Sequence, residues 1–143
     1  MAFPAEEQGV ESLWVEPVLS SGSELCLFRV WNIPLFVYGV SLHDVVTGTK
    51  DENRVLKFEK VVSRGGHSTF RLIVAKKYED EEFERFWAPL GELGCTYAGV
   101  STTFLAVDVP REVPIRPVID RLEEGERLGI WKFEEGHVEH IMK

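Results

Sequence analysis

The chain has 143 residues, of which 44% are hydrophobic, and its formal net charge is −8. This is enough apolar material for a compact core, which excludes a disordered chain, and no apolar run reaches the roughly 18 to 20 residues that span a bilayer. The N-terminus lacks the basic and apolar regions of a secretory signal, so we expect a cytoplasmic protein that is not in a membrane. The acidic balance disfavours nucleic-acid binding, and it suits a basic protein partner or serves solubility alone.

The first half of the chain has the pattern of short strands joined by turns. Residues 1–11 are polar and mixed, which predicts a loosely held lead-in. Pro17 lies inside a strand-forming segment, residues 13–19, and indicates an edge strand because proline cannot donate to a neighbouring strand. Three further strands are predicted, over residues 24–31, 44–49 and 55–63. We therefore expect residues 1–66 to form an N-terminal β subdomain, a small bent sheet or partial barrel.

Residues 31–46 are the most distinctive passage of the chain. They are strongly apolar and contain Pro34 and Gly39, which interrupt a regular strand. The passage predicts a buried crossing between the second and third strands. The turn that follows the fourth strand, residues 64–67, has two adjacent glycines that can adopt positive φ, and it predicts a tight hairpin.

In the second half the pattern changes to a helical one. Apolar residues at helical spacing and acids in the first turn predict a helix over residues 80–93. Pro89 predicts a kink or a short second turn within it, and Gly94 predicts its end.

The remaining elements complete a recognisable order. A second helix is predicted over residues 115–124, with Gly125 and Gly129 bracketing its end. Strands are predicted over residues 69–75, 95–100, 104–109 and 130–133. The order strand, helix, strand, strand, helix, strand is the split βαβ plan of ferredoxin-like domains, so we expect an α+β protein with a ferredoxin-like subdomain over residues 67–143. The two subdomains could also form one compact unit.

Part of this sequence resembles a known family. The passage Asn-Ile-Pro-Leu-Phe-Val-Tyr-Gly-Val-Ser-Leu-His-Asp-Val-Val at residues 32–46, together with segments 58–62, 93–95 and 107–110, is similar to an uncharacterised bacterial family catalogued only as a domain of unknown function. The resemblance covers about residues 13–133. It implies no catalytic residues, because that family has no established activity. The chain is similar more weakly, in architecture and charge only, to small acidic ferredoxin-like regulators that inhibit ribonucleases.

Four residues of the distinctive passage are candidates for binding a ligand. Trp31, Tyr38, Ser41 and His43 could border a cleft between the two subdomains, since an irregular apolar loop with polar groups can do so. Ser41 and His43 share a strand face, but no Gly-x-Ser-x-Gly accompanies them, which disfavours a serine hydrolase. Asp44 would point to the opposite face, and capping or turning the chain is its favoured role.

Three other groups of residues can each be interpreted as structural or as functional. The group of His67, His137 and His140 could bind a metal, but incidental surface histidines are favoured. The two cysteines, Cys26 and Cys95, are interpreted as small buried hydrophobes in a reducing compartment. A basic strip within Lys50 to Lys77 could bind phosphate or RNA or could protect a sheet edge, and the sequence does not decide its role. The strip consists of Lys57, Arg64, Arg71, Lys76 and Lys77.

These observations favour a protein without enzymatic activity. The sequence has no phosphate loop, dinucleotide fingerprint or Cys-x-x-Cys, so we assign no catalytic residue, metal or cofactor. The leading hypothesis is a protein-interaction module that binds and neutralises or regulates a basic partner, as an inhibitor or immunity protein does. The alternative is a small-ligand-binding regulator or enzyme with its site between the subdomains, near Trp31, Tyr38 and His43. The oligomeric state is not determined by these patterns.

Overall fold

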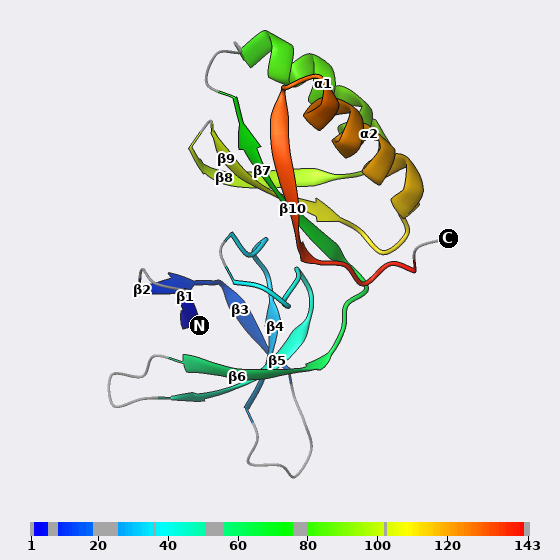
Figure 1. Ribbon diagram of the computed structural model, residues 1–143. Helices are drawn as coiled ribbons and strands as arrows, with labels where there is room; N and C mark the ends of the chain where they lie inside the picture. Colours follow the sequence, from blue (N-terminus) through cyan, green and yellow to red (C-terminus); the bar gives the residue numbers. More distant parts are fainter. Residues whose placement is uncertain are drawn as a thin grey trace.

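The computed structural model describes residues 2–5, 9–18, 26–35, 37–50, 56–75, 80–101 and 103–141. It is a mixed α+β structure with two β-sheets, and two helices cover the C-terminal one (Figure 1). Among the described residues, neither helix has the length and apolar character needed to cross a membrane.

The N-terminal sheet has six strands in the order β2-β1-β6-β5-β4-β3. Their bounds are β1 Ala2–Ala5, β2 Gly9–Ser12, β3 Val15–Val18, β4 Cys26–Val30, β5 Val45–Lys50 and β6 Leu56–Ser63. Neighbouring strands are antiparallel except β1 and β6, which pair in parallel. The edge position of β3, which contains Pro17, is confirmed. The antiparallel pairing of β1 with β2 in the N-terminal lead-in was not predicted.

The C-terminal sheet has four antiparallel strands in the order β10-β7-β9-β8. Its elements are β7 Ser68–Val74, α1 Asp80–Leu93, β8 Thr96–Ser101, β9 Phe104–Val109, α2 Ile115–Arg127 and β10 Trp131–His137. Alternate residues of β7, such as Phe70 and Leu72, are buried in a core with both helices, so α1 and α2 share one face of this sheet. The predicted sequence of strands and helices is confirmed.

The course of α1 at Pro89 and the end of α2 near Gly125 differ from the sequence-based prediction. Helix α1 is one continuous helix with Pro89 inside it, so the predicted second turn is wrong. Helix α2 continues past Gly125 to Arg127. A Cβ at Gly125 would lie 2.3 Å from the ring of Trp131, whose Nε1 donates to the Leu122 carbonyl at 3.0 Å. Gly125 therefore lets the tryptophan pack against the helix and does not end it.

We expect Gly125→Ala to lower the free energy of unfolding by about 1–3 kcal/mol, because the added methyl group overpacks against Trp131. Urea denaturation of the wild type and the variant measures this. Gly91→Ala in α1 is the control, since its Cβ would lie 3.3 Å from Trp87 Nε1, a tight contact that needs a far smaller shift than the one at Gly125. Alanine also favours a helix, so the control should change little. Equal effects at both positions would contradict the close packing of Trp131.

The segment 64–67 joins the two sheets and does not form a hairpin. Strand β6 pairs with β5 and β1, whereas β7 pairs with β9 and β10, so the predicted hairpin between β6 and β7 is wrong. The glycines allow close approach instead. A Cβ at Gly65 would lie 2.7 Å from the carbonyl oxygen of His43, and Gly66 has φ +91°.

Candidate functional site

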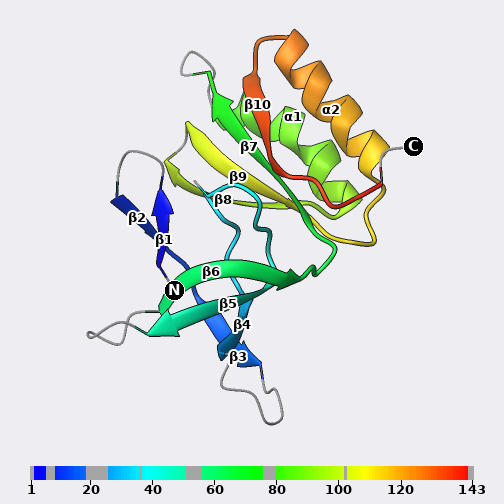
Figure 2. The same ribbon diagram turned by 60° about the horizontal axis from the view of Figure 1, so that its bottom comes forward.

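Residues 31–44, here called the connecting loop, join β4 to β5 and reach across to the C-terminal sheet. Figure 2 shows this loop in cyan, rising from the lower sheet toward the strands of the upper one. Gly39 N donates to the Gly136 carbonyl of β10 at 3.0 Å, and the hydroxyls of Ser41 and Thr69 lie 2.6 Å apart. Thr69 is on the face of β7 opposite the helices. The passage does link the second and third predicted strands, and it also fastens the two sheets together.

The loop is only partly buried, which corrects the expectation of a buried crossing. Val40 and Ser41 are buried, but Trp31 and Tyr38 are 46% and 49% exposed. Tyr38 donates to Glu134 Oε1 at 2.8 Å, and its ring lies against the guanidinium of Arg71, 4.6 Å from the ring centre. The described contacts of Tyr38 and Ser41 therefore hold the loop on the C-terminal sheet. Phe36, another aromatic residue of this loop, lies outside the described residues.

Asp44 organises the end of the connecting loop. Its carboxylate is fully buried and accepts hydrogen bonds from Ser41 N and Gly65 N, both at 2.9 Å. Arg64 forms an ion pair with it at 3.0 Å and also donates to the Gly39 carbonyl. The predicted role of Asp44 in turning the chain is confirmed.

His43 is the described non-glycine residue with positive φ, at 70°. This backbone conformation is costly for a residue with a side chain, by about 1–3 kcal/mol, and such strain gathers at functional sites. Its backbone N donates to the Val30 carbonyl at 2.8 Å. Its ring packs edge-to-face with Trp31, with 4.6 Å between ring centres. Ser41 and His43, which were predicted to share a strand face, have different side-chain partners, Thr69 and His67.

His43, His67 and Asp108 form a chain of side-chain contacts that we call the histidine chain. His43 Nδ1 lies 3.2 Å from His67 Nε2, and His67 Nδ1 lies 2.8 Å from Asp108 Oδ1. Asp108, in β9, is 2% exposed. The histidine chain therefore runs from a buried carboxylate of the C-terminal sheet to the connecting loop of the N-terminal sheet.

The surroundings of the histidine chain shift the pKa values of its two histidines in opposite directions. The hydrogen bond with Asp108 raises the pKa of His67 above its usual value, and burial opposes this only in part. Burial lowers the pKa of His43, and the positive charge of His67 lowers it further. When the pair holds one extra proton, the positive charge therefore lies on His67, beside Asp108.

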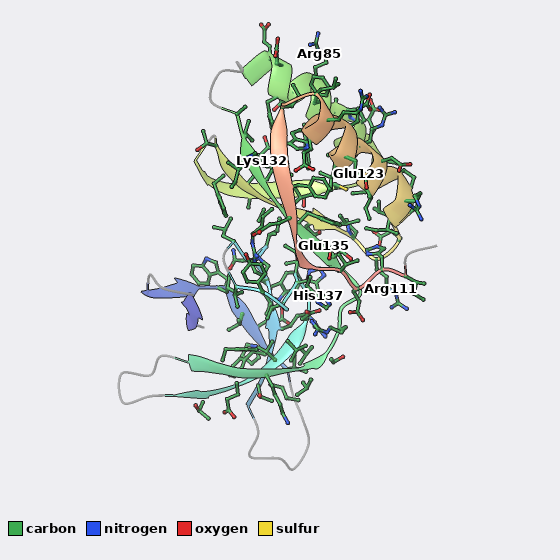
Figure 3. All side chains as sticks on the ribbon, viewed as in Figure 1. Arg85, Arg111, Glu123, Lys132, Glu135 and His137 are labelled. Carbon is green, nitrogen blue, oxygen red and sulfur yellow. The ribbon has the colours of Figure 1, made fainter. Side chains whose placement is uncertain are left out.

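His43 and Trp31 border a cavity of about 400 Å³. Its lining residues are Arg29, Trp31, His43, Val45, Ser63, Arg64, Gly65 and Arg111. One wall is a row across three strands, since Arg29 pairs with Val45 and Val45 pairs with Ser63. Arg111 comes from the segment between β9 and α2 and lies near the C-terminal segment (Figure 3). Residues of both halves of the chain therefore form the cavity.

Three arginines and no carboxylate line this cavity. Arg64 is neutralised by Asp44 and lies 3.9 Å from Glu139. Within the described part of the chain, neither Arg29 nor Arg111 has a carboxylate within ion-pair distance. Glu16 is opposite Arg29 in the pairing of β3 with β4, but it is exposed. The cavity is therefore locally positive in a chain whose net charge is −8.

The remaining candidate residues have structural partners. The description of the histidines as incidental surface residues is wrong for His140, which contacts Ser68 Oγ at 2.6 Å and the Pro110 carbonyl at 2.9 Å. His137 lies 2.9 Å from Glu139. In the described residues, no three metal-ligating side chains cluster. Cys95 is a buried free thiol whose pKa burial raises to about 12, as expected of a small buried hydrophobe.

Two members of the predicted basic strip have structural partners, and the side chain of Lys57 is not among those described. Arg64 binds Asp44, and Arg71 is buried and donates to the Val37 carbonyl. Lys76 and Lys77 lie outside the described residues. Sequence reasoning also missed Arg29, Arg111 and Asp108 as site residues. Only Asp108 left a local signal, an acid between Val107 and Val109 in a strand that is otherwise apolar.

The fold and the site define an α+β domain with a positive cavity where its two sheets meet. The chain belongs to the family described as Domain of unknown function (DUF4265), which matches residues 11–133, and this confirms the resemblance to an uncharacterised family. A comparison with curated proteins finds no match. Among solved structures, the chain is similar to a hypothetical protein from Neisseria gonorrhoeae, with a TM-score of 0.75 and 16% identity over 98% of this chain and 93% of the other. At that identity the likeness shows a shared fold.

Proposed function

We propose that the protein binds a small ligand in the cavity between its two sheets, with Trp31 and His43 in contact with the ligand. The observation that supports this is the position of His43. Its strained backbone conformation places the ring where it contacts His67 and also lines the cavity. Such strain costs stability, and it is typical of functional sites. The cavity volume also lies in the range of about 300–1,000 Å³ that is typical of small-molecule sites.

The proposal divides the four predicted ligand residues into two pairs. Trp31 and His43 line the cavity. Tyr38 and Ser41 contact the C-terminal sheet through Glu134 and Thr69, so they are proposed to position the loop.

Thermal-shift screening with a panel of anionic, neutral and cationic metabolites tests the proposal, because a ligand that binds the folded state raises the melting temperature. We expect at least one compound to stabilise the wild type, and we expect Trp31→Ala and His43→Gln to remove that shift. Tyr38→Phe is the matched control, since it keeps the ring and removes only a hydroxyl outside the cavity. A panel without any stabilising compound, or a shift that survives both variants, would contradict this site.

A protein partner is a second candidate function, favoured by the charges on the outer surface. Among the described side chains of residues 81–141, ten acidic and six basic ones are exposed. Glu123 on α2 and Glu135 on β10 are two of these acids (Figure 3). An inhibitor or immunity protein for a basic partner would use such a surface. Its partner should co-purify at low salt, be lost at high salt and fail to bind Glu123→Lys or Glu135→Lys, whereas Trp31→Ala should still bind it.

The proposal also includes a ferredoxin-like C-terminal half, a boundary between two subdomains and a cytoplasmic location. The order β10-β7-β9-β8 with both helices on one face supports a ferredoxin-like plan for the C-terminal half. The change of sheet at residues 64–67 supports a boundary between subdomains 1–66 and 67–143. The buried free thiol of Cys95 is compatible with a bacterial cytoplasmic location.

A further inference from the structure

We propose that the cavity is a proton-coupled site for a small oxyanion, in which Arg29 and Arg111 bind a carboxylate or phosphate group and the histidine chain takes up one proton as the anion binds. This inference rests on the proposed ligand-binding function and names the chemical class of the ligand.

The charges of the lining residues select an anion. Arg29 and Arg111 come from different halves of the chain and lie on the same cavity, without an ion-pair partner among the described residues. A guanidinium donates two parallel hydrogen bonds to a carboxylate or phosphate, so two of them can hold one oxyanion. The Ser63 hydroxyl lies in the same row as Arg29 and can add a further donor. A cation would meet no compensating charge from the lining.

The histidine chain decides whether His43 repels or binds that anion. With no extra proton, His67 donates Nδ1–H to Asp108, and its Nε2 accepts Nδ1–H from His43. His43 Nε2 then carries a lone pair, which repels an oxyanion. One added proton reverses the central hydrogen bond, since His67 now donates Nε2–H to His43 Nδ1. His43 remains neutral and presents Nε2–H as a donor.

The proton balance of this change is simple. One proton from solvent enters at His43 Nε2, the Nδ1 proton of His43 passes to His67 Nε2, and the positive charge lies on His67 beside Asp108. No other bond forms or breaks. His67 and Asp108 act through His43 and are therefore positioning residues.

Several charged groups face the two rings from the elements packed against them. Asp108 of β9, Glu112 before α2 and Asp44 of the connecting loop favour the protonated pair, whereas Arg29 of β4 opposes protonation of His43. Arg64 and Arg111 line the same cavity. A bound anion would offset the charge of the arginines, so binding and proton uptake should reinforce each other.

Isothermal titration calorimetry of the chelator-treated protein tests the proposal, with sulfate as a phosphate-like probe and acetate as a carboxylate probe. Both probes keep their charge between about pH 6 and pH 8, so any proton exchanged belongs to the protein. Comparing buffers of different ionisation enthalpy gives the number of protons taken up. We expect at least one probe to bind, with uptake of up to one proton and with weaker binding as pH rises.

The variants separate the two parts of the proposal. Arg29→Gln and Arg111→Gln should each weaken binding of the probe about tenfold or more across this pH range. His67→Gln should abolish proton uptake and flatten the pH profile while some binding remains. Arg116→Gln, an exposed arginine of α2 outside the cavity, is the matched control and should change neither. Histidine ¹⁵N NMR shifts of the wild type provide a second measurement, because added anion should protonate His67 and leave His43 neutral with its proton on Nε2.

Each outcome has a definite meaning. If neutral or cationic compounds stabilise the protein through Trp31 and His43 while sulfate and acetate do not bind, the ligand-binding function stands and the oxyanion proposal is overturned. Anion binding without proton uptake, or with unchanged affinity in both arginine variants, also overturns it. If no compound of the metabolite panel and neither probe binds, both proposals fail.

Discussion

Asp44→Ala should lower the free energy of unfolding by about 1–3 kcal/mol for each buried donor that it leaves without an acceptor. The carboxylate is fully buried and accepts from the backbone of Ser41 and Gly65 while it pairs with Arg64. Alanine would leave these donors without their acceptor, in the segment where the two sheets meet. Urea denaturation at neutral pH, with the slope compared between variants, measures the loss.

Asp44→Asn is the informative companion to this substitution. Asparagine has nearly the same size and keeps one oxygen acceptor, so it should retain part of the backbone hydrogen bonding and lose the ion pair. We expect an effect smaller than that of alanine. Glu124→Ala, which removes an exposed ion pair with Arg121 on α2, should cost less than about 1 kcal/mol. Equal losses at Asp44 and Glu124 would show that the buried carboxylate does not organise the loop.

Asp108→Ala should destabilise the protein by about 1–3 kcal/mol, and the loss should depend on pH. The folded-state pKa of His67 is raised by Asp108, so protonation of His67 stabilises the folded protein. That stabilisation is fully present below the unfolded pKa of about 6.5 and is lost as pH rises through the folded pKa. The difference in unfolding free energy between wild type and variant should therefore be larger near about pH 6 than near about pH 9.

Two variants control for other causes of this pH dependence. Asp120→Ala removes an exposed carboxylate of α2 and should give a small difference that does not change over the same range. His67→Gln should remove most of the pH-dependent part of the Asp108 effect, because the titrating partner is then absent. A difference between wild type and Asp108→Ala that grows from pH 6 to pH 9 would contradict the assigned role of Asp108.

The outcome at individual residues shows where local sequence patterns suffice. Asp44 was predicted to turn the chain, and it does so, because a short acidic side chain binds backbone N–H groups close to it in sequence. Gly94, with φ +114°, follows the last residue of α1 as predicted. The second helix was likewise predicted to end just before a glycine, Gly125, but it continues to Arg127. The reason is not local, because Gly125 packs against the ring of Trp131, which lies beyond the helix in sequence.

The candidate site was predicted only in part, for the same reason. Trp31 and His43 were identified because they belong to an irregular passage that could border a cleft, and both line the cavity. Tyr38 and Ser41 come from the same passage, but their contacts are with the C-terminal sheet. Residues that share a loop have the same sequence signal whether they face a neighbouring sheet or a cavity.

By itself, the sequence determined the order of strands and helices in the second half, the edge position of β3 and the turning role of Asp44. These features depend on periodicity, on proline and on hydrogen bonds between neighbouring residues, all of which are local. Only the tertiary structure decided that His43, His67 and Asp108 meet, and that Arg29 and Arg111 share a cavity. Those residues lie in segments far apart in the chain, and they come together only because the connecting loop fastens one sheet to the open face of the other.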